Sequence, residues 1–231
     1  MLDERSGSDE VVRSRGARVG LAVGLGLLAV AALWAGFTGA GPAQLDGPAL
    51  AESIEDRNAG LTGVAVVITT VGSTVAMAVL AVAVGAWCWW RGRHVDAVLA
   101  VGAMAGASLL FRLLKLVLER ARPPIADHAV AVSSESLPSG HATMSTVVIG
   151  TIVVLAWSGR SVGERTAMVL AAALCVGAVG ATRVYLGVHW LSDVLAGWPV
   201  GAAWLAVCVL LWTRWRAREP RAREGAEKLR P

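Results

Sequence analysis

His189 and Asp193 lie four positions apart near the carboxyl-terminal end of the chain. If a helix begins near His189, the two side chains lie on the same helical face. A carboxylate that accepts a hydrogen bond from one ring nitrogen fixes the imidazole tautomer and leaves the other nitrogen free as a nucleophile. A metal site is poorly supported, because no further carboxylate or histidine stands at ligand spacing. Taken alone, the pair is a candidate nucleophile with its orienting carboxylate, and a purely structural His–Asp pair is the alternative.

A second group, Pro138-Ser139-Gly140-His141, leads directly into an apolar run that starts at Ala142. This order predicts the start of a helix, because Ser139 is a good N-cap and Gly140 lets a ligand approach the backbone closely. Free N–H groups and the positive end of the helix dipole make such a terminus an anion-binding site. His141 then lies in the first turn, beside any bound anion. The alternative is an ordinary capped helix with a surface histidine.

Two cations, Lys115 and Arg122, stand seven positions apart, or two helical turns, so they share a face if the helix continues. Pro123 disfavours helical geometry at the residue before it, so we expect the helix to end at Arg122. A third cation, Arg183, precedes His189 by six positions. Two interfacial cations that extend their charged ends toward water are the alternative explanation for Lys115 and Arg122.

The polar residues in and around these three segments lie inside or beside apolar stretches. A charged side chain at the centre of a membrane-spanning helix costs about 2.5–3.5 kcal/mol on insertion scales. They are Arg112, Lys115, Arg120, Arg122, His141, Arg183, His189 and Asp193. Five of these eight are Arg or Lys, so something anionic must offset their cost. An anion with three acceptor oxygens fits three cations, a helix terminus and two histidines together, and phosphate is such an anion.

Long apolar stretches must position these residues. Of the 231 residues, 55% are hydrophobic, above the roughly 45–50% of soluble domains. Six stretches have lengths suited to crossing about 30 Å of hydrocarbon, the fourth being the shortest: Ala17–Gly39, Leu61–Trp90, Val95–Leu118, Ala142–Trp157, Thr166–Val188 and Leu191–Trp212. The second carries no charge, whereas helices of a large soluble protein need polar faces. The sequence predicts an all-α, polytopic membrane protein with six transmembrane helices in a bundle.

The net charge of +4 does not indicate nucleic acid binding, because of where the cations lie. With six spans, 15 Arg and Lys residues fall in segments on one side, and only Arg57, Arg120 and Arg122 fall in loops on the other. The positive-inside rule then predicts cytoplasmic termini and an extracytoplasmic site. We expect a cytoplasmic arm over residues 1–16, a membrane domain over 17–213 and a basic tail over 214–231 that can touch anionic lipid.

The three segments, in order Lys-x6-Arg-Pro, Pro-Ser-Gly-His and Arg-x5-His-x3-Asp, resemble the motifs of the type 2 phosphatidic acid phosphatase (PAP2) superfamily. Each matches at the expected internal spacing, from Lys115 to Asp193. The six-helix layout resembles the membrane-bound branch of that family over most of the chain. One departure is Thr182, which stands where many members have serine before the third-motif arginine and which keeps a hydroxyl.

This resemblance implies a membrane lipid phosphate phosphatase that works through a phosphohistidine, without a metal or other cofactor. It implies that His189 is the nucleophile, that Asp193 orients it, and that His141 is the general acid for the leaving lipid alkoxide. The residues it implies for holding the phosphate are Lys115, Arg122, Ser139, Gly140 and Arg183. Three fixed cations can supply the charge stabilisation that a metal would otherwise supply.

Two other kinds of protein are alternatives to a lipid phosphate phosphatase. Vanadium haloperoxidases share these motifs, but their known pattern is soluble, and the six spans argue against them. A non-catalytic lipid-phosphate binder needs cations but not a nucleophile with an orienting carboxylate, so His141, His189 and Asp193 favour catalysis.

The sequence does not name the lipid, because phosphatidate, phosphatidylglycerophosphate and a polyprenyl diphosphate all offer a terminal phosphate at the interface. Apolar surroundings of an outward-facing site favour polyprenyl diphosphate. Composition rich in Ala, Arg and Val and poor in Lys favours the plasma membrane of a bacterium with a GC-rich genome.

Overall fold

The computed structural model describes residues 3–218, with side chains from residue 16 onward, and this part of the chain contains helices and no strands. The elements are α1 (Asp3–Thr38), the short 3-10 helix η1 (Gly41–Leu45), α2 (Asp46–Glu55), α3 (Ala59–Val71), α4 (Thr74–Trp90), α5 (His94–Leu118), the 3-10 turn η2 (Ile125–Asp127), α6 (Gly140–Ala156), α7 (Val162–Tyr185) and α8 (Leu191–Arg216). The all-α class is therefore confirmed for the described residues.

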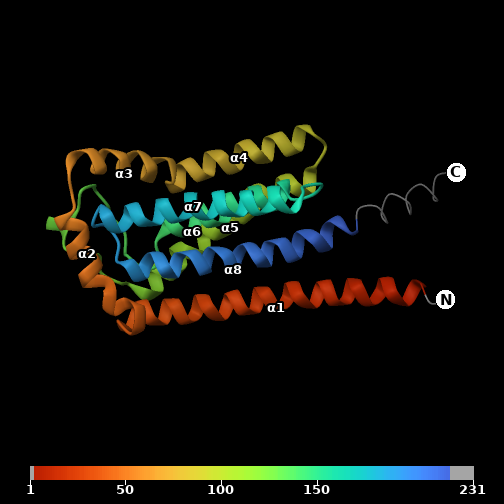
Figure 1. The fold of residues 1–231 in the computed structure, drawn as a ribbon, viewed down its shortest axis with the longest axis horizontal. Coiled ribbons are helices and arrows are strands. Elements are labelled where there is room, and N and C mark those ends of the chain that lie inside the picture. The colour runs from red at the N-terminus through yellow and green to blue at the C-terminus, as the bar shows by residue number, and fades with distance from the viewer. Residues whose placement is uncertain (1–2, 219–231) are drawn as a thin grey trace.

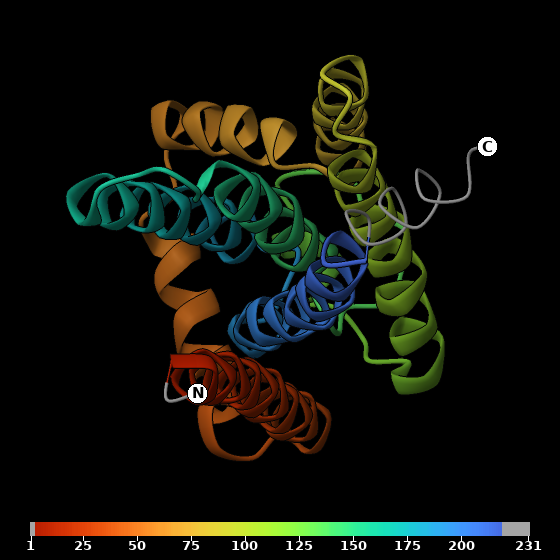
Figure 2. The same cartoon turned by 90° about the vertical axis from the view of Figure 1, so that its right-hand side faces the viewer.

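The long helices run side by side along one axis of the molecule (Figures 1 and 2). The centre of the bundle is formed by α6 and α8, which pack against each other. On the outside, α1 packs on α8, α5 and α7 pack on α6, and α4 packs on α5. Buried apolar side chains from α5 and α6, including Ala107, Met144 and Val147, form the largest core cluster. The short helix α6 thus begins inside the bundle, with its first turn surrounded by other helices.

Large apolar side chains cover the outside of the bundle. Leu27 of α1, Val79 of α4 and Leu174 of α7 have exposed fractions of 67%, 64% and 75%. Extensive apolar surface of this kind suits contact with lipid rather than with water. Within residues 3–218, four helices are long and apolar enough to cross a membrane, namely α5, α7, α8 and the segment Gly16–Thr38 of α1.

The second predicted span, Leu61–Trp90, is wrong as a single helix. It is divided into α3 and α4, which are bent by 43° where they meet. Ser73 caps the second half by accepting a hydrogen bond from the N–H of Ala76 at 3.2 Å, so a new helix begins there. Gly72 lets the break lie directly on α7, because a Cβ at this position would overlap the side chain of Val179.

Counting the bent pair as one span gives five, and α6, with 17 residues, is shorter than the other candidate spans. The number of six spans therefore stays a prediction, as does the cytoplasmic location of the termini. The apolar part of α1 matches the predicted first span, but α1 begins at Asp3, so most of the predicted arm over residues 1–16 is helical. The predicted tail is helical as far as Arg216, and its residues from 219 onward lie outside the described part of the chain.

A short helix that was not predicted, α2, joins α1 to α3 and lies across one end of the bundle (Figure 1). Its segment is short and polar, which resembles a loop in the sequence. The buried residues of α2 are Asp46 and Leu50. A buried carboxylate in the first turn indicates that this helix has polar partners inside the protein.

The two ends of the bundle carry different segments. The start of α1, the end of α8, the α4–α5 turn and the α6–α7 turn lie at one end (Figure 1). Those turns hold Arg91, Arg93 and Arg160. The opposite end carries α2, the loop between α5 and α6, and the α7–α8 turn. The segments predicted to share one side of the membrane therefore share one end of the molecule.

Candidate active site

His189 and Asp193 meet at the turn between α7 and α8, where Nδ1 of His189 lies 3.2 Å from Oδ2 of Asp193. Helix α8 begins at Leu191, the first residue of the predicted sixth span, so His189 lies in the turn just before the helix that carries Asp193. The contact forms because Asp193, in the first turn of α8, reaches back over the helix terminus. The N–H of Trp190 donates to the same oxygen at 2.9 Å and holds the carboxylate there. Both side chains of the pair are buried.

Glycine is required in the turn that carries this histidine. Gly187 has a φ of +69°, and a Cβ there would overlap the carbonyl oxygen of Asp127. This turn also ends α7 at Tyr185, three residues before the predicted limit of Val188.

The outer nitrogen of His189, Nε2, lies 3.2 Å from Nη1 of Arg122. A guanidinium donates hydrogen bonds and cannot accept them, so Nε2 is the unprotonated nitrogen and Nδ1 carries the proton that Asp193 accepts. Burial lowers the pKa of His189, although the hydrogen bond and charge of Asp193 act in the opposite direction. The imidazole is therefore neutral at pH 7, with a free lone pair on the nitrogen that a nucleophile would use.

The helix that carries the first motif ends before Arg122, where it was expected to end, so Lys115 and Arg122 do not share a helical face. Helix α5 ends at Leu118, because Glu119 adopts a left-handed φ of 44° and the chain leaves the helix there. Lys115 is therefore on the helix, and Arg122 is on the loop that follows. Both nevertheless line one cavity.

Backbone oxygens of the loop before α6 hold these two cations. Lys115 is buried, donates to the carbonyl of Glu135 and lies 3.4 Å from Oγ of Ser134. Arg122 donates to the carbonyls of Ser134 and Val188. Neutral carbonyls fix the direction of the two side chains without cancelling their charge, so both remain available to an anion.

The third cation, Arg183, is buried in α7 and donates through Nη1 to Oγ1 of Thr69 at 2.7 Å. Thr69 lies in the last turns of α3, just before the break of the bent span. Nε of Arg183 is buried and has no hydrogen-bond partner among the described residues. The break thus places a hydroxyl where it orients a cation of the site.

The start of α6 differs in one respect from the prediction. Ser139 occupies the N-cap position but its side chain makes no capping hydrogen bond, so its predicted role as a cap is wrong. Its N–H donates instead to the carbonyl oxygen of Asp193 at 3.0 Å, which ties the start of α6 to α8. Its Oγ is buried and has no partner among the described residues. Gly140 and His141 follow and line the cavity, as an anion-binding helix terminus requires.

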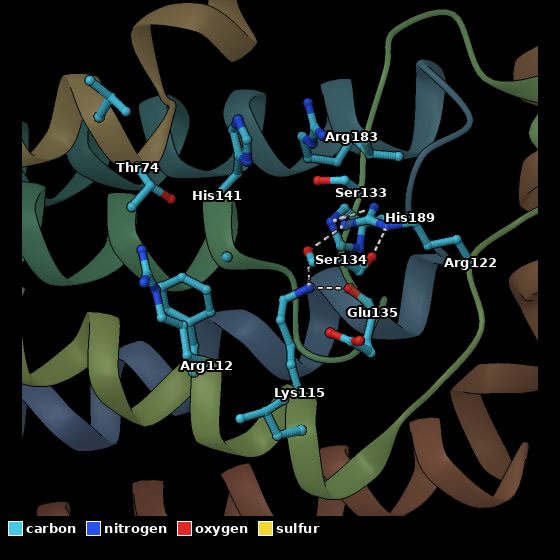
Figure 3. A pocket seen from close by; sticks show the side chains of 15 residues that line it. Thr74, Arg112, Lys115, Arg122, Ser133, Ser134, Glu135, His141, Arg183 and His189 are labelled. Carbon is cyan, nitrogen blue, oxygen red and sulfur yellow. Dashed lines mark hydrogen bonds between the residues drawn. The ribbon is translucent and has the colours of Figure 1, made fainter.

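These residues line one cavity, which has a volume of about 560 Å³. Six of the eight predicted site residues line it: Lys115, Arg122, Gly140, His141, Arg183 and His189. The other two, Ser139 and Asp193, lie behind its wall. Figure 3 shows Lys115 pointing toward Ser134 and Glu135, with Arg122 beside His189. The sequence-predicted residues are therefore brought together.

No role was predicted for Arg120, Asp46 and Ser136, which lie behind the cavity wall with Asp193. Arg120 donates through Nη1 to Oδ1 of Asp193 at 2.6 Å and through Nη2 to Oδ2 of Asp46 at 2.7 Å. Asp46 also accepts hydrogen bonds from the N–H and the hydroxyl of Ser192, at 2.8 and 2.6 Å. Ser136 donates to the other oxygen of Asp193. Arg120 is one of the eight polar residues that the sequence places in or beside apolar stretches, but nothing near it in the sequence indicated Asp46 as its partner.

Among the residues that the structure describes, no group of three or more His, Cys, Asp or Glu side chains is placed to hold a metal ion. Independence from metals stays a prediction.

The family model for the PAP2 superfamily matches residues 96–217, which is more than half of the chain. The chain belongs to the PAP2 superfamily. Phosphatidylglycerophosphatase B of Bacillus subtilis (strain 168) is 34% identical over 137 residues, an alignment that covers 58% of this chain and 66% of that relative. The chain thus spans just under two thirds of this PAP2 relative.

A crystal structure of a transmembrane PAP2 type phosphatidylglycerolphosphate phosphatase from Bacillus subtilis matches with a TM-score of 0.73 and 27% identity. The match covers 81% of this chain and 94% of the other. Membership of the PAP2 superfamily and both relatives indicate a phosphatase enzyme, and they support a multi-pass bacterial membrane protein.

Proposed function

We propose that this protein is a lipid phosphate phosphatase in which His189 forms a phosphohistidine intermediate. The observation that carries the proposal is the arrangement of His189, whose Nδ1 contacts a buried carboxylate while its unprotonated Nε2 lies beside Arg122 at a cavity lined with cations. Positioning and charge stabilisation are the main requirements of phosphoryl transfer. A binder would need the cations but not the oriented histidine.

In the first step, Nε2 of His189 attacks the phosphorus of the substrate. The N–P bond forms while the bond from phosphorus to the lipid oxygen breaks, and the leaving oxygen takes a proton from His141. Lys115, Arg122 and Arg183 stabilise the charge on the three remaining oxygens. Asp193 stabilises the positive charge that develops on the imidazole, through the proton on Nδ1.

In the second step, water attacks the phosphohistidine. His141, now unprotonated, accepts a proton from this water while the N–P bond breaks. Inorganic phosphate leaves, and His189 and His141 return to their starting protonation states. The free N–H groups at the start of α6, next to Gly140, donate to the same phosphate oxygens in both steps.

The relatives support phosphatidylglycerophosphate as the first candidate substrate. Polyprenyl diphosphate is the second candidate, because Phe111, Leu116 and Val75 give the cavity a mainly apolar wall next to its cations. Phosphatidate is the third.

The distribution of Arg and Lys supports a site on the extracytoplasmic side of the plasma membrane. The α4–α5 turn and the α6–α7 turn, with Arg91, Arg93 and Arg160, lie at the opposite end of the bundle from the α7–α8 turn (Figure 1), which carries His189.

A panel of these lipids in non-ionic detergent tests the proposal, with released inorganic phosphate as the readout and His189→Ala as the control. Rapid quenching of the wild type with a radiolabelled lipid should trap a phosphoenzyme that is stable in alkali and labile in acid, as expected of phosphohistidine. The absence of phosphate release from all of the lipids would contradict the function, and an alkali-labile phosphoenzyme would contradict the intermediate.

A further inference from the structure

Arg112 lines the cavity but takes no part in the steps above. It stands on α5 three residues before Lys115, which places the two Cβ atoms about 5–6 Å apart. In the view of Figure 3, Arg112 and Thr74 lie on one side and the cluster around His189 lies on the other, and all of these residues line the same cavity. Cations therefore lie on both sides of the cavity in this view.

The charge of Arg112 has no counter-charge in the described part of the chain. No carboxylate there forms an ion pair with it, and no hydrogen bond to its guanidinium is found. Glu135 is the one carboxylate among the lining residues, and it makes no ion pair with Arg112. Lys115, of like charge, repels it. An unpaired cation on an apolar span is costly, so an anion from outside the protein is expected beside it.

The reacting phosphate does not account for this fourth cation. Lys115, Arg122 and Arg183 already line the cavity together with His189, and Arg122 contacts its Nε2. Three residues of helix correspond to about 4.5 Å along the axis, so Arg112 lies deeper along α5 than Lys115. A lipid whose terminal phosphate lies beside His189 must pass Arg112 before its apolar chains reach the bilayer interior.

We propose that Arg112, with Thr74 next to it, forms a second anion subsite that binds the non-reacting phosphate of a lipid with two phosphate groups. This inference rests on the proposed function and narrows its substrate class. The second phosphate is either a phosphodiester separated from the first by a glycerol, as in phosphatidylglycerophosphate, or the inner phosphate of a polyprenyl diphosphate. A lipid with one phosphate, such as phosphatidate, leaves Arg112 without a partner.

Steady-state kinetics with matched substrate pairs test the subsite. The first pair is phosphatidylglycerophosphate and phosphatidate with the same acyl chains, and the second is a polyprenyl diphosphate and its monophosphate. In Arg112→Gln, kcat/KM for the two-phosphate member of one pair should fall about tenfold, mainly through a higher KM, while the one-phosphate member changes less than about twofold. The pair that shows this difference identifies the source of the second phosphate. An equal fall for both members of both pairs, or no fall, would overturn the proposal.

Two variants serve as controls. Arg112→Lys keeps the charge and should keep the preference within about threefold of the wild type. Leu113→Gln puts the same new amide on the next residue of α5, which is 50% exposed and does not line the cavity. It should leave all of the rates unchanged, and a loss of preference in this variant would also count against the proposal.

A binding measurement separates this inference from the proposed function. Isothermal titration needs no turnover and uses methylenediphosphonate, which has the spacing of a diphosphate, pentane-1,5-diylbisphosphonate, which has the spacing of two phosphates on one glycerol, and methylphosphonate as the one-phosphate probe. Arg112→Gln should weaken binding of one of the two bisphosphonates about tenfold and leave binding of methylphosphonate unchanged. An inactive wild type that still shows this difference would contradict the phosphatase and support the subsite, whereas equal binding by the wild type and the variant would overturn the subsite alone.

Discussion

Arg120 binds Oδ1 of Asp193 at 2.6 Å, while His189 binds Oδ2 of the same carboxylate at 3.2 Å. The second guanidinium nitrogen of Arg120 binds Asp46. One buried cation therefore lies between two buried carboxylates, and the carboxylate that orients the histidine is fixed from behind. The position of the Asp193 carboxylate therefore depends on Arg120 and, through Arg120, on Asp46, which lies outside the three motifs.

Replacing Arg120 with glutamine should destabilise the fold and slow the reaction. The substitution leaves Asp46 and Asp193 buried without their shared cation, and breaking a buried ion pair typically costs about 3–5 kcal/mol. Unfolding by SDS in mixed micelles measures the loss, and Arg120→Lys should restore part of it. Arg160→Gln, which removes an exposed pair with Glu164, is the matched control and should change stability little. Equal stability of the Arg120 and Arg160 variants would show that the pair is dispensable.

The two histidines should respond differently to the leaving group. His189→Ala removes the nucleophile and should abolish turnover of any substrate, by roughly four orders of magnitude or more. His141→Ala removes only the acid, which contributes about 10²–10⁴-fold. Nitrophenyl phosphate, whose leaving group departs without protonation, should therefore partly rescue His141→Ala and leave His189→Ala inactive. Rescue of the His189 variant instead would reverse the two roles.

Asp193→Asn should retain activity between those two variants. Its geometry survives, but control of the tautomer of His189 is lost, as happens when the aspartate of a serine-protease triad is replaced by asparagine. Phosphate release from the lipid at saturation measures this ranking. A variant as active as the wild type would show that Asp193 does not orient the imidazole.

The pH profile of kcat/KM should be bell-shaped, because His189 must be neutral and His141 must be protonated. Burial lowers the pKa of His189, so its lone pair stays available as the pH falls below the ordinary histidine value of about 6.5. The acid limb should therefore lie below that value. With nitrophenyl phosphate, His141→Ala should lose the alkaline limb and keep the acid one. An acid limb at or above 6.5 would contradict a buried, neutral nucleophile.

Accessibility labelling tests the side of the membrane. Ala131→Cys lies in the exposed loop between η2 and α6, and Ser158→Cys lies in the exposed α6–α7 turn at the other end. Both are introduced after Cys88, Cys175 and Cys208 are replaced by alanine. An impermeant maleimide should label position 131 in intact cells and position 158 only in opened membranes. The reverse pattern would place the cavity in the cytoplasm.

Activity should persist in EDTA, because Lys115, Arg122 and Arg183 provide the charge at the reacting phosphate. Vanadate should inhibit, since it can mimic five-coordinate phosphorus. Phosphate release with and without the chelator checks both points. Activity that disappears in EDTA and returns with magnesium would contradict a reaction carried by the three cations alone.

The local motifs were sufficient to predict which cations and histidines meet at the cavity. Lys115, His141, Arg183 and His189 lie at fixed short spacings next to apolar stretches, and the fold brings them together. Spacing was less informative about helix ends. Lys115 and Arg122 were expected on one helix, whereas Glu119 ends α5 between them.

The supporting contacts could not be predicted in this way, because they join distant parts of the chain. Arg183 and Thr69 are 114 positions apart, and Ser192 and Asp46 are 146 apart. No periodicity or spacing links such pairs before the helices have packed. The break at Gly72 was missed although Gly72 and Ser73 are a glycine followed by an N-cap residue, because the apolar stretch continues on both sides of them.

Asp46 lies outside residues 96–217, the region that matches the family model. The orienting carboxylate of the site is therefore held partly by a segment that the family signature does not contain. A chimaera that joined residues 96–217 to the amino-terminal helices of a relative would keep every motif and still leave Arg120 with one carboxylate instead of two, unless the donor supplied an acid at the same place. Positions 46 and 120 thus form a unit that must be inherited or exchanged together.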